Sequence, residues 1–276
     1  MQFFAAFSAG RGLFVWVLFN RRGEVAGSVA FGAGGGMGGS GAGFFGGFCE
    51  LTILKLKHEI MKKYKLAVFD MDGTLFDSID TIYNAAIDTF EKLGMKNVEF
   101  PRDKFSAKIG GHFADIFEEF GIEVPDVEHY IDVYKDIYFN HIDDTKFYPG
   151  IPELLTDLKN SGAQLALLTT KNQFQTERIA DKFGLHEWFG YLMGRKQGVK
   201  IKPDPEPLEI IIDHFATAKA DTVMIGDSEF DIGCGHNAGV DTIAAGYGYR
   251  NREFLLRLKP TFFAADVSEL RRLLLG

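Results

Sequence analysis

The feature that most constrains the fold of this chain is one stretch, residues 66–78, which reads LAVFDMDGTLFDS. It begins with a short apolar run and then turns abruptly polar at Asp70, Asp72 and Gly73. An apolar run that is closed by polar residues and glycine is typical of a buried strand in a parallel sheet. Ligands of open α/β sheets bind beyond the carboxyl ends of such strands. The stretch therefore predicts a strand that carries two carboxylates at a ligand-binding edge.

The carboxylates of Asp70 and Asp72 indicate a cation site. Two close carboxylates resist joint ionisation unless a cation compensates them, and a cluster of oxygen ligands favours Mg²⁺. Taken alone, the pattern also fits the capped start of a helix with solvated acids, because Asp and Thr are common N-caps. The rest of the chain has to decide between these two interpretations.

The composition is that of an ordinary globular protein. The 276 residues leave room for one sizeable core and a smaller unit. The net charge of −8 argues against general binding to nucleic acid or to anionic membranes, and no apolar run reaches the roughly 20 residues of a spanning helix. Cys49 and Cys234 are the only cysteines. Two cysteines argue against a disulfide framework and favour a reducing compartment such as the cytoplasm.

Residues 1–60 differ from the remainder, since Gly, Phe and Ala dominate and residues 32–47 form a low-complexity glycine tract. Such a tract has high backbone entropy and little to pack, so we expect this extension to be disordered or loosely attached. Arg21 and Arg22 follow the apolar run at residues 13–19 and no small-residue cleavage site is evident, which disfavours a secretory signal. Met61 is a natural start before the first strand. We therefore hypothesise that residues 1–60 are an added or mis-assigned segment.

Residues 78–148 have a helical pattern. Apolar residues recur there at spacings of three and four, as in Ile79, Ile82, Tyr83, Ala86 and Phe90. Residues 115–120 and 127–139 repeat this pattern, and a single crossover between parallel strands needs far fewer residues. The pattern predicts a helical cap domain over residues 78–148, inserted between two core segments at residues 61–77 and 149–276.

After residue 149 the pattern alternates between strands and helices. Strands are predicted at residues 164–169, 189–193, 222–227 and 242–245, and helices at residues 151–160, 174–183, 207–215, 232–238, 253–258 and 268–274. This alternation implies a parallel sheet with right-handed crossovers and helices on both faces. The expected fold class is therefore α/β, with an inserted α-helical cap.

Polar groups stand at three further strand ends or loops: Thr169, Thr170 and Lys171, then Lys202, then Asp227 and Asp231. Each group alone fits an ordinary role, as a helix cap, a solvated lysine or first-turn acids. In a parallel sheet, however, the carboxyl ends of the strands face the same edge, so these groups are expected to converge on one crevice.

The converging groups suit a phosphoryl site. Asp70, Asp72 and Asp227 supply hard oxygen ligands for one Mg²⁺, while Lys202 and Thr169 offer a positive charge and a donor for a dianion. Asp70 follows the strand directly and is therefore the better aimed nucleophile. A carboxylate that attacks phosphorus forms an aspartyl-phosphate. Asp72 can protonate the leaving oxygen and later deprotonate the hydrolytic water.

Together these segments resemble the signature motifs of the haloacid dehalogenase superfamily of phosphohydrolases, in the family order. They read DMDGT from residue 70, LLTT around residue 169, KPDP from residue 202 and GDSEFD through residue 231. The resemblance covers about residues 65–276. It implies a Rossmann-like core, Mg²⁺ and a mobile cap inserted after the first motif. Residues 1–60 resemble nothing in the family.

The resemblance also implies a role for each motif residue. Asp70 would be nucleophile and metal ligand, and Asp72 would be acid/base and a metal ligand through its backbone carbonyl. The phosphoryl group would be held by Thr169, Thr170 and Lys202. Asp227 would be a direct ligand of the metal, and Asp231 would support the metal through water.

Asp72 also separates branches of the superfamily, because its dehalogenases lack an acid at this position. The chain is most similar to the phosphoglycolate-phosphatase-like group, on the evidence of the run at residues 148–150, the Thr-x-Lys pattern at residues 169–171 and the KPDPEPL run. The expected function is a Mg²⁺-dependent phosphomonoester hydrolase that acts on a small phosphorylated metabolite such as phosphoglycolate.

Specificity is expected to lie with the cap loop at residues 109–112. Gly110 and Gly111 would let the backbone approach a substrate, and closure would exclude water. His112 could touch the leaving group or face solvent.

Other functions remain open at this point. They are a sugar-phosphate mutase or phosphotransferase, a phospho-Asp signalling module, and an inactive partner-binding homologue. The Arg/Ser-rich cap loop of the mutases is not evident, and the helical insert and Asp72 argue against the signalling module. The protein is expected to be a monomer or a homodimer.

Overall fold

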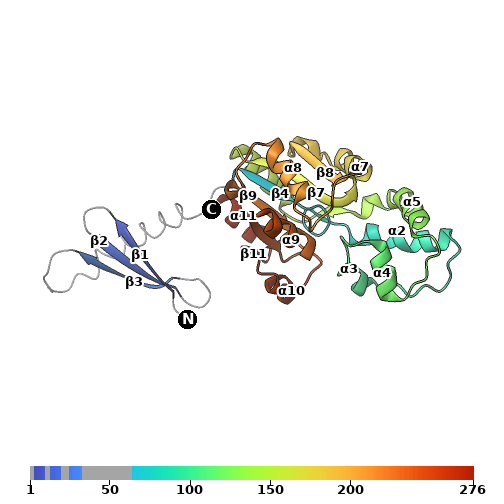
Figure 1. The fold of residues 1–276 in the computed structure, drawn as a ribbon, viewed down its shortest axis with the longest axis horizontal. Coiled ribbons are helices and arrows are strands. Elements are labelled where there is room, and N and C mark those ends of the chain that lie inside the picture. Colours follow the sequence, from blue (N-terminus) through green and yellow to red (C-terminus); the bar gives the residue numbers. More distant parts are fainter. Residues whose placement is uncertain (1–2, 10–12, 20–24, 33–63) are drawn as a thin grey trace. The chain divides into compact units, whose positions relative to one another are not determined.

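The computed structural model describes residues 3–9, 13–19, 25–32 and 64–276 (Figure 1). The chain divides into two compact units, Met1–Leu56 and Lys57–Gly276. In the part of the chain that the structure describes, no helix is both long and apolar enough to cross a membrane.

The first unit contains a small antiparallel sheet in the order β1-β2-β3. Its strands are β1 (Phe3–Ala9), β2 (Leu13–Phe19) and β3 (Val25–Gly32). The sequence analysis predicted no strands here, although the β-branched and aromatic residues of β2 favour extended backbone. The rest of the glycine tract and Met61 lie outside the described residues. The hypothesis that residues 1–60 are not native stays a prediction.

The second unit is built on a six-stranded sheet in the order β11-β10-β9-β4-β7-β8. The strands are β4 (Leu66–Phe69), β7 (Gln164–Asn172), β8 (Tyr191–Arg195), β9 (Thr222–Gly226), β10 (Asp241–Ala245) and β11 (Phe262–Ala264). All five neighbouring pairs are parallel. Strand order reverses at β4, which lies between β7 and β9. Ligand crevices form at such a switch point.

Helices cover both faces of this sheet (Figure 1). They are α6 (Ile151–Asn160), α7 (Gln173–Phe183), α8 (Glu206–His214), α9 (Glu229–Ala238), α10 (Arg252–Arg257) and α11 (Val267–Leu275). Successive side chains of β4 point to opposite faces of the sheet, and each face is covered by its own layer of helices. Leu66 and Val68 join a buried cluster with residues of α8 and α9, whereas Ala67 and Phe69 join a cluster with residues of α6 and α11. The predicted α/β fold class is confirmed.

The cap consists of α2 (Ile79–Lys92), α3 (Arg102–Ser106), α4 (Phe113–Phe120) and α5 (Val127–Tyr138), grouped at one end of the unit in Figure 1. Its interior is aromatic, with the rings of Phe90 and Tyr130 centred 4.9 Å apart. The buried Tyr130 hydroxyl donates to the Ala86 carbonyl at 2.9 Å and so fastens α5 to α2.

A two-stranded stem joins the cap to the core. In it, β5 (Phe76–Asp77) pairs antiparallel with β6 (Lys146–Phe147). Three short 3₁₀ helices complete the described elements: η1 (Ile142–Asp144), η2 (Leu185–Glu187) and η3 (Lys219–Asp221). The predicted strand at residues 189–193 begins two residues later, as β8, and this shift places Arg195 at the carboxyl end of the strand.

Candidate active site

The groups predicted from the strand ends line one small crevice at the carboxyl edge of the sheet. Asp70 follows β4 directly, Thr169 belongs to β7, and Asp227 follows β9. The crevice is lined by these three residues together with Asp72, Thr170, Lys202, Ser228 and three residues that approach from the cap loop and α9. Segments separated by more than a hundred residues of chain therefore meet at the switch point of the sheet.

Lys202 is the buried centre of this crevice. Its Nζ lies 2.7 Å from Asp70 Oδ1 and 2.5 Å from Asp231 Oδ1, and it also donates to the Leu168 carbonyl at 2.9 Å. Burial alone would lower the pKa of Lys202, but the carboxylates of Asp231 and Asp70 outweigh burial and raise it. Lys202 is therefore a fixed positive charge beside Asp70.

Three carboxylates form a group that suits a metal ion. Asp70, Asp227 and Asp231 each offer an oxygen, and these oxygens lie within 4.8 Å of one another. Burial raises the pKa of Asp70 to about 7 and raises the pKa of Asp227 well above its usual range, and the charge of Asp231 adds to both shifts. Clustered carboxylates that resist joint ionisation are the donor set that a hard divalent cation fits.

Hydrogen bonds hold two of these acids in place. The backbone N–H of Tyr249 donates to Asp227 Oδ2 at 2.7 Å. The hydroxyl and backbone N–H of Ser228 donate to Asp231 Oδ2 at 2.5 Å and 3.1 Å, and the Asp231 N–H donates back to the Ser228 side chain, which completes a capping box at the start of α9. The acids are thus oriented by the core itself.

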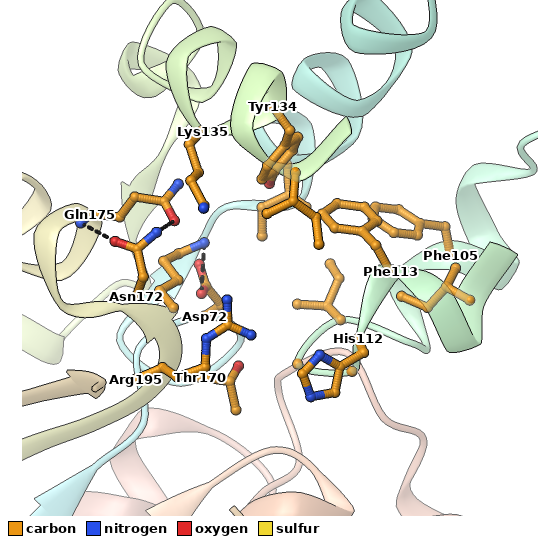
Figure 2. A pocket seen from close by; sticks show the side chains of 17 residues that line it. Asp72, Phe105, His112, Phe113, Tyr134, Lys135, Thr170, Asn172, Gln175 and Arg195 are labelled. Atoms are coloured by element: carbon orange, nitrogen blue, oxygen red, sulfur yellow. Dashed lines mark hydrogen bonds and ion pairs between the residues drawn. The ribbon is translucent and has the colours of Figure 1, made fainter. Parts of the chain in front are cut away.

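The side chain of Asp72 stands apart from the metal-binding group and has partners of its own. The Ser78 hydroxyl donates to Asp72 Oδ1 at 2.6 Å, and Lys171 Nζ lies 3.1 Å from Asp72 Oδ2. The carboxylate faces a second, larger cavity (Figure 2). Asp72 therefore stands between the crevice and this cavity, and it lines both.

The larger cavity lies between the core and the cap and has a volume of about 120 Å³. Its cap side includes Phe105, Phe113 and Tyr134, and its core side includes Lys171 and Arg195 (Figure 2). The predicted specificity loop lines it as well, through Gly110, Gly111 and His112. The two cavities share Asp72, Ile109, Gly110 and Thr170, so a molecule held in one would extend into the other.

One arginine of the core holds the cap loop. Arg250 is 5% exposed, and its guanidinium donates to the Ile109 carbonyl at 3.0 Å. Two further hydrogen bonds, of 2.8 Å and 3.1 Å, bind the same guanidinium to Glu229 on α9. The ring of Phe230, next along α9, lies beneath Gly110. The cap loop is therefore fastened to the core beside the crevice.

The sequence analysis found the motif residues but not their supports. Lys171 was noted only as part of a strand end, and no role was predicted for Ser78, Tyr249 or Arg250. The basic residue in the Thr-x-Lys pattern could have indicated a partner for Asp72. The contacts of Tyr249 and Arg250 depend on a loop after β10 and leave no local signal.

Comparisons with known proteins agree with this geometry. The family model of the haloacid dehalogenase-like hydrolases matches residues 67–245. The chain belongs to this family. The match begins at β4 and ends at β10, so it includes the crevice and the whole cap.

Curated relatives match about three quarters of the chain. A phosphoglycolate phosphatase of Psychrobacter arcticus is 32% identical over 217 residues, which are 75% of this chain and 94% of the relative. The pyrophosphatase PpaX of Halalkalibacterium halodurans is 30% identical over 211 residues, with 74% of this chain and 93% of the relative covered. Among solved structures, a predicted phosphatase of Clostridium acetobutylicum matches with a TM-score of 0.66 at 27% identity, over 76% of this chain and 97% of that one.

These relationships confirm the predicted superfamily, the Rossmann-like core and an enzyme of the phosphatase-like hydrolase class. The roles of individual residues rest on the geometry described above.

Proposed function

We propose that the protein is a Mg²⁺-dependent phosphomonoester hydrolase that acts on a small phosphorylated metabolite, such as phosphoglycolate, through an aspartyl-phosphate on Asp70. The observation that carries the proposal is the position of Asp70. Its carboxylate stands at the switch point of the sheet, 2.7 Å from the Lys202 ammonium and grouped with the acids Asp227 and Asp231. A nucleophile, a fixed cation and a metal-binding set thus share one crevice.

The phosphoryl group would be held by residues of the core. Lys202 neutralises its charge from beneath, and Thr169 and Thr170 line the same crevice and offer donors to its oxygens. Asp70 and Asp227 would hold Mg²⁺, together with the backbone carbonyl of Asp72. When bound, the ion supplies further neutralisation of the phosphoryl charge. Asp231 keeps Lys202 in place and would support the metal site.

Asp72 is suited to move the proton. As an oxygen of Asp70 bonds to phosphorus, the bond from phosphorus to the leaving oxygen breaks, and that oxygen takes a proton from Asp72. Asp72 then takes a proton from the water that attacks the aspartyl-phosphate, which restores both acids and releases phosphate. Ser78 and Lys171 hold the Asp72 carboxylate at the junction of the two cavities, and the leaving oxygen of the substrate would lie at this junction.

The relatives support this choice of reaction. Two of them are named for phosphoglycolate and for pyrophosphate, and both compounds place a small leaving group on phosphorus. The charge of −8 and the scarcity of cysteine accord with a small-metabolite enzyme of the cytoplasm rather than with a nucleic-acid enzyme.

The test is phosphate release from a panel of phosphorylated metabolites and from an aryl phosphate, with Mg²⁺ present. Asp70→Asn should lower kcat by roughly 1,000-fold or more, because the nucleophile is lost. Asp77→Asn, an exposed aspartate of β5 that lines neither cavity, serves as the matched control and should keep its activity. Removal of metal with EDTA should stop the reaction, and added Mg²⁺ should restore it.

Full activity of Asp70→Asn would refute the proposal. Release of an isomerised phosphate in place of free phosphate would instead identify a mutase.

A further inference from the structure

The larger cavity contains an arginine that has no ion-pair partner among residues 64–276, the part of this unit that the structure describes. Arg195 ends β8, where it pairs with Asn172 at the end of β7 after an irregularity in the register of the two strands. Figure 2 shows its side chain extending from the core into the cavity, on the side of Thr170 and opposite the cap residues His112 and Phe113. Arg195 is partly buried, so solvent screens its charge only in part.

The two lysines that line the cavity have carboxylate partners. Lys171 pairs with Asp72 at 3.1 Å, and Lys135 of α5 pairs with Asp132 at 2.8 Å. Within residues 64–276, by contrast, the side chain of Arg195 forms no hydrogen bond or ion pair. Asp72 is the only acid that lines this cavity in that part of the chain, and Lys171 and Ser78 already occupy it. The cavity therefore holds a surplus positive charge.

We propose that Arg195 is a specificity-determining residue that binds a second anionic group, a carboxylate or a phosphate, on the leaving group of the substrate. This inference rests on the proposed phosphomonoester hydrolysis. A guanidinium offers paired N–H donors that match the two oxygens of a carboxylate or phosphate.

The position of Arg195 also limits the length of the substrate. The crevice around Asp70 and the cavity around Arg195 share Asp72 and Thr170, so a phosphoryl group in the crevice and a second anion at Arg195 would lie in adjoining cavities. The opposite wall is formed by bulky cap side chains such as Phe105, Phe113 and Tyr134, and the cavity, with a volume of about 120 Å³, favours a small leaving group. The preferred substrate class is a short phosphorylated acid or pyrophosphate, and not a neutral sugar phosphate.

The decisive experiment compares substrates that differ in the second charge. Phosphoglycolate and pyrophosphate carry it, whereas 2-hydroxyethyl phosphate replaces the carboxylate of phosphoglycolate by a neutral hydroxymethyl group. Arg195→Gln should lower kcat/KM for one or both charged substrates by roughly 10- to 100-fold, the size expected for loss of a hydrogen bond to a charged group. It should change kcat/KM for 2-hydroxyethyl phosphate by less than about threefold. The charged substrate that suffers the larger loss identifies the anion.

Two further variants separate recognition from general charge or folding. Lys196→Gln removes the same charge one residue away, from a side chain that lies 5.4 Å over the Tyr191 ring and is not part of the cavity lining. It should leave all three rates unchanged. Arg195→Lys keeps the charge without the paired donors and should recover part of the loss on the charged substrates.

A binding measurement distinguishes failure of this inference from failure of the proposed function. In the Asp70→Asn background with Mg²⁺, calorimetric titration should show weaker phosphoglycolate binding when Arg195→Gln is added, and unchanged binding of 2-hydroxyethyl phosphate. Equal losses on charged and neutral substrates, or no loss on either, would overturn the role of Arg195. If the wild-type protein releases phosphate from none of the three compounds, the metabolite panel and the aryl phosphate, the proposed function fails. Hydrolysis of other compounds but of neither charged substrate, or equal phosphoglycolate affinity with and without Arg195→Gln, would overturn the inference alone.

Discussion

The core and the cap contribute to the site in opposite ways. The core supplies charged side chains that are buried and held by each other, with Lys202 between Asp70 and Asp231. The cap loop supplies backbone and small residues, and one hydrogen bond from Arg250 to the Ile109 carbonyl fastens it. The difference suggests a division of labour in which the core fixes the chemistry and the cap controls what enters and how well water is excluded.

A disruption of the core should accordingly cost much stability and much activity, whereas a disruption of the cap loop should cost less of both. The three substitutions below test that contrast in order of their expected effect.

The largest effect is expected for Lys202→Met. Methionine keeps most of the apolar volume but leaves the carboxylates of Asp70 and Asp231 buried without their cation. Removal of one partner from a buried ion pair typically costs about 3–5 kcal/mol of unfolding free energy. Urea unfolding in Mg²⁺-free buffer should show a loss of that order, and phosphate release should fall to background.

Lys182→Met provides the control for Lys202→Met. Lys182 pairs with Asp143 at 2.5 Å, but both side chains are largely exposed, so the loss should stay below about 1 kcal/mol. If the two lysine variants unfold at the same urea concentration, the buried network does not stabilise the core, and the contrast with the cap fails.

The second effect is expected for Gly73→Ala, directly after the proposed catalytic acids Asp70 and Asp72. Gly73 has φ +78°, and a Cβ there would lie 2.4 Å from Asp227 Oδ2. Asp227 cannot retreat without losing its hydrogen bond from Tyr249. Misplacement of a reacting group by about 1 Å can cost roughly 100-fold in rate, so kcat should fall by that factor or more. Calorimetric Mg²⁺ titration should also show weaker binding, and unchanged Mg²⁺ affinity would contradict this reading.

The core side of the site was largely predictable from sequence because its signals are local. The apolar run before Asp70, the polar residues in the last part of β7 and those after β9 mark strand ends, and parallel strands bring such ends to one edge. The amphipathic spacing of residues 79–90 likewise predicted α2.

The contact between cap and core was not predictable in the same way. Arg250 and Ile109 are 141 residues apart, and nothing near either residue indicates the other. Arg195 also gave no signal in the sequence. The strand predicted at residues 189–193 lies at residues 191–195, because pairing with β7 and not the local sequence pattern decides where β8 begins and ends. The short elements α3 and β11 were missed for a related reason, since few residues carry too weak a periodic signal and packing decides their structure.

The smallest effect is expected for Gly110→Ala, the cap counterpart of Gly73→Ala. Gly110 also has a left-handed φ, +96°, but its Cβ would lie 3.3 Å from Phe230 Cδ2, the edge of a ring that can shift slightly. We expect kcat/KM to fall by roughly threefold to tenfold through poorer closure of the loop, and the unfolding free energy to change by about 1 kcal/mol. Gly121→Ala is the control, because Gly121 has φ +66° at the end of α4 with nothing within 4 Å of its added Cβ. Alanine at this position must also adopt a left-handed backbone conformation, but its side chain does not contact the core, so kcat/KM should not change. If Gly121→Ala lowered kcat/KM as much as Gly110→Ala does, the effect would come from weakening of the cap as a whole, and the loop at Gly110 would have no special part in closure.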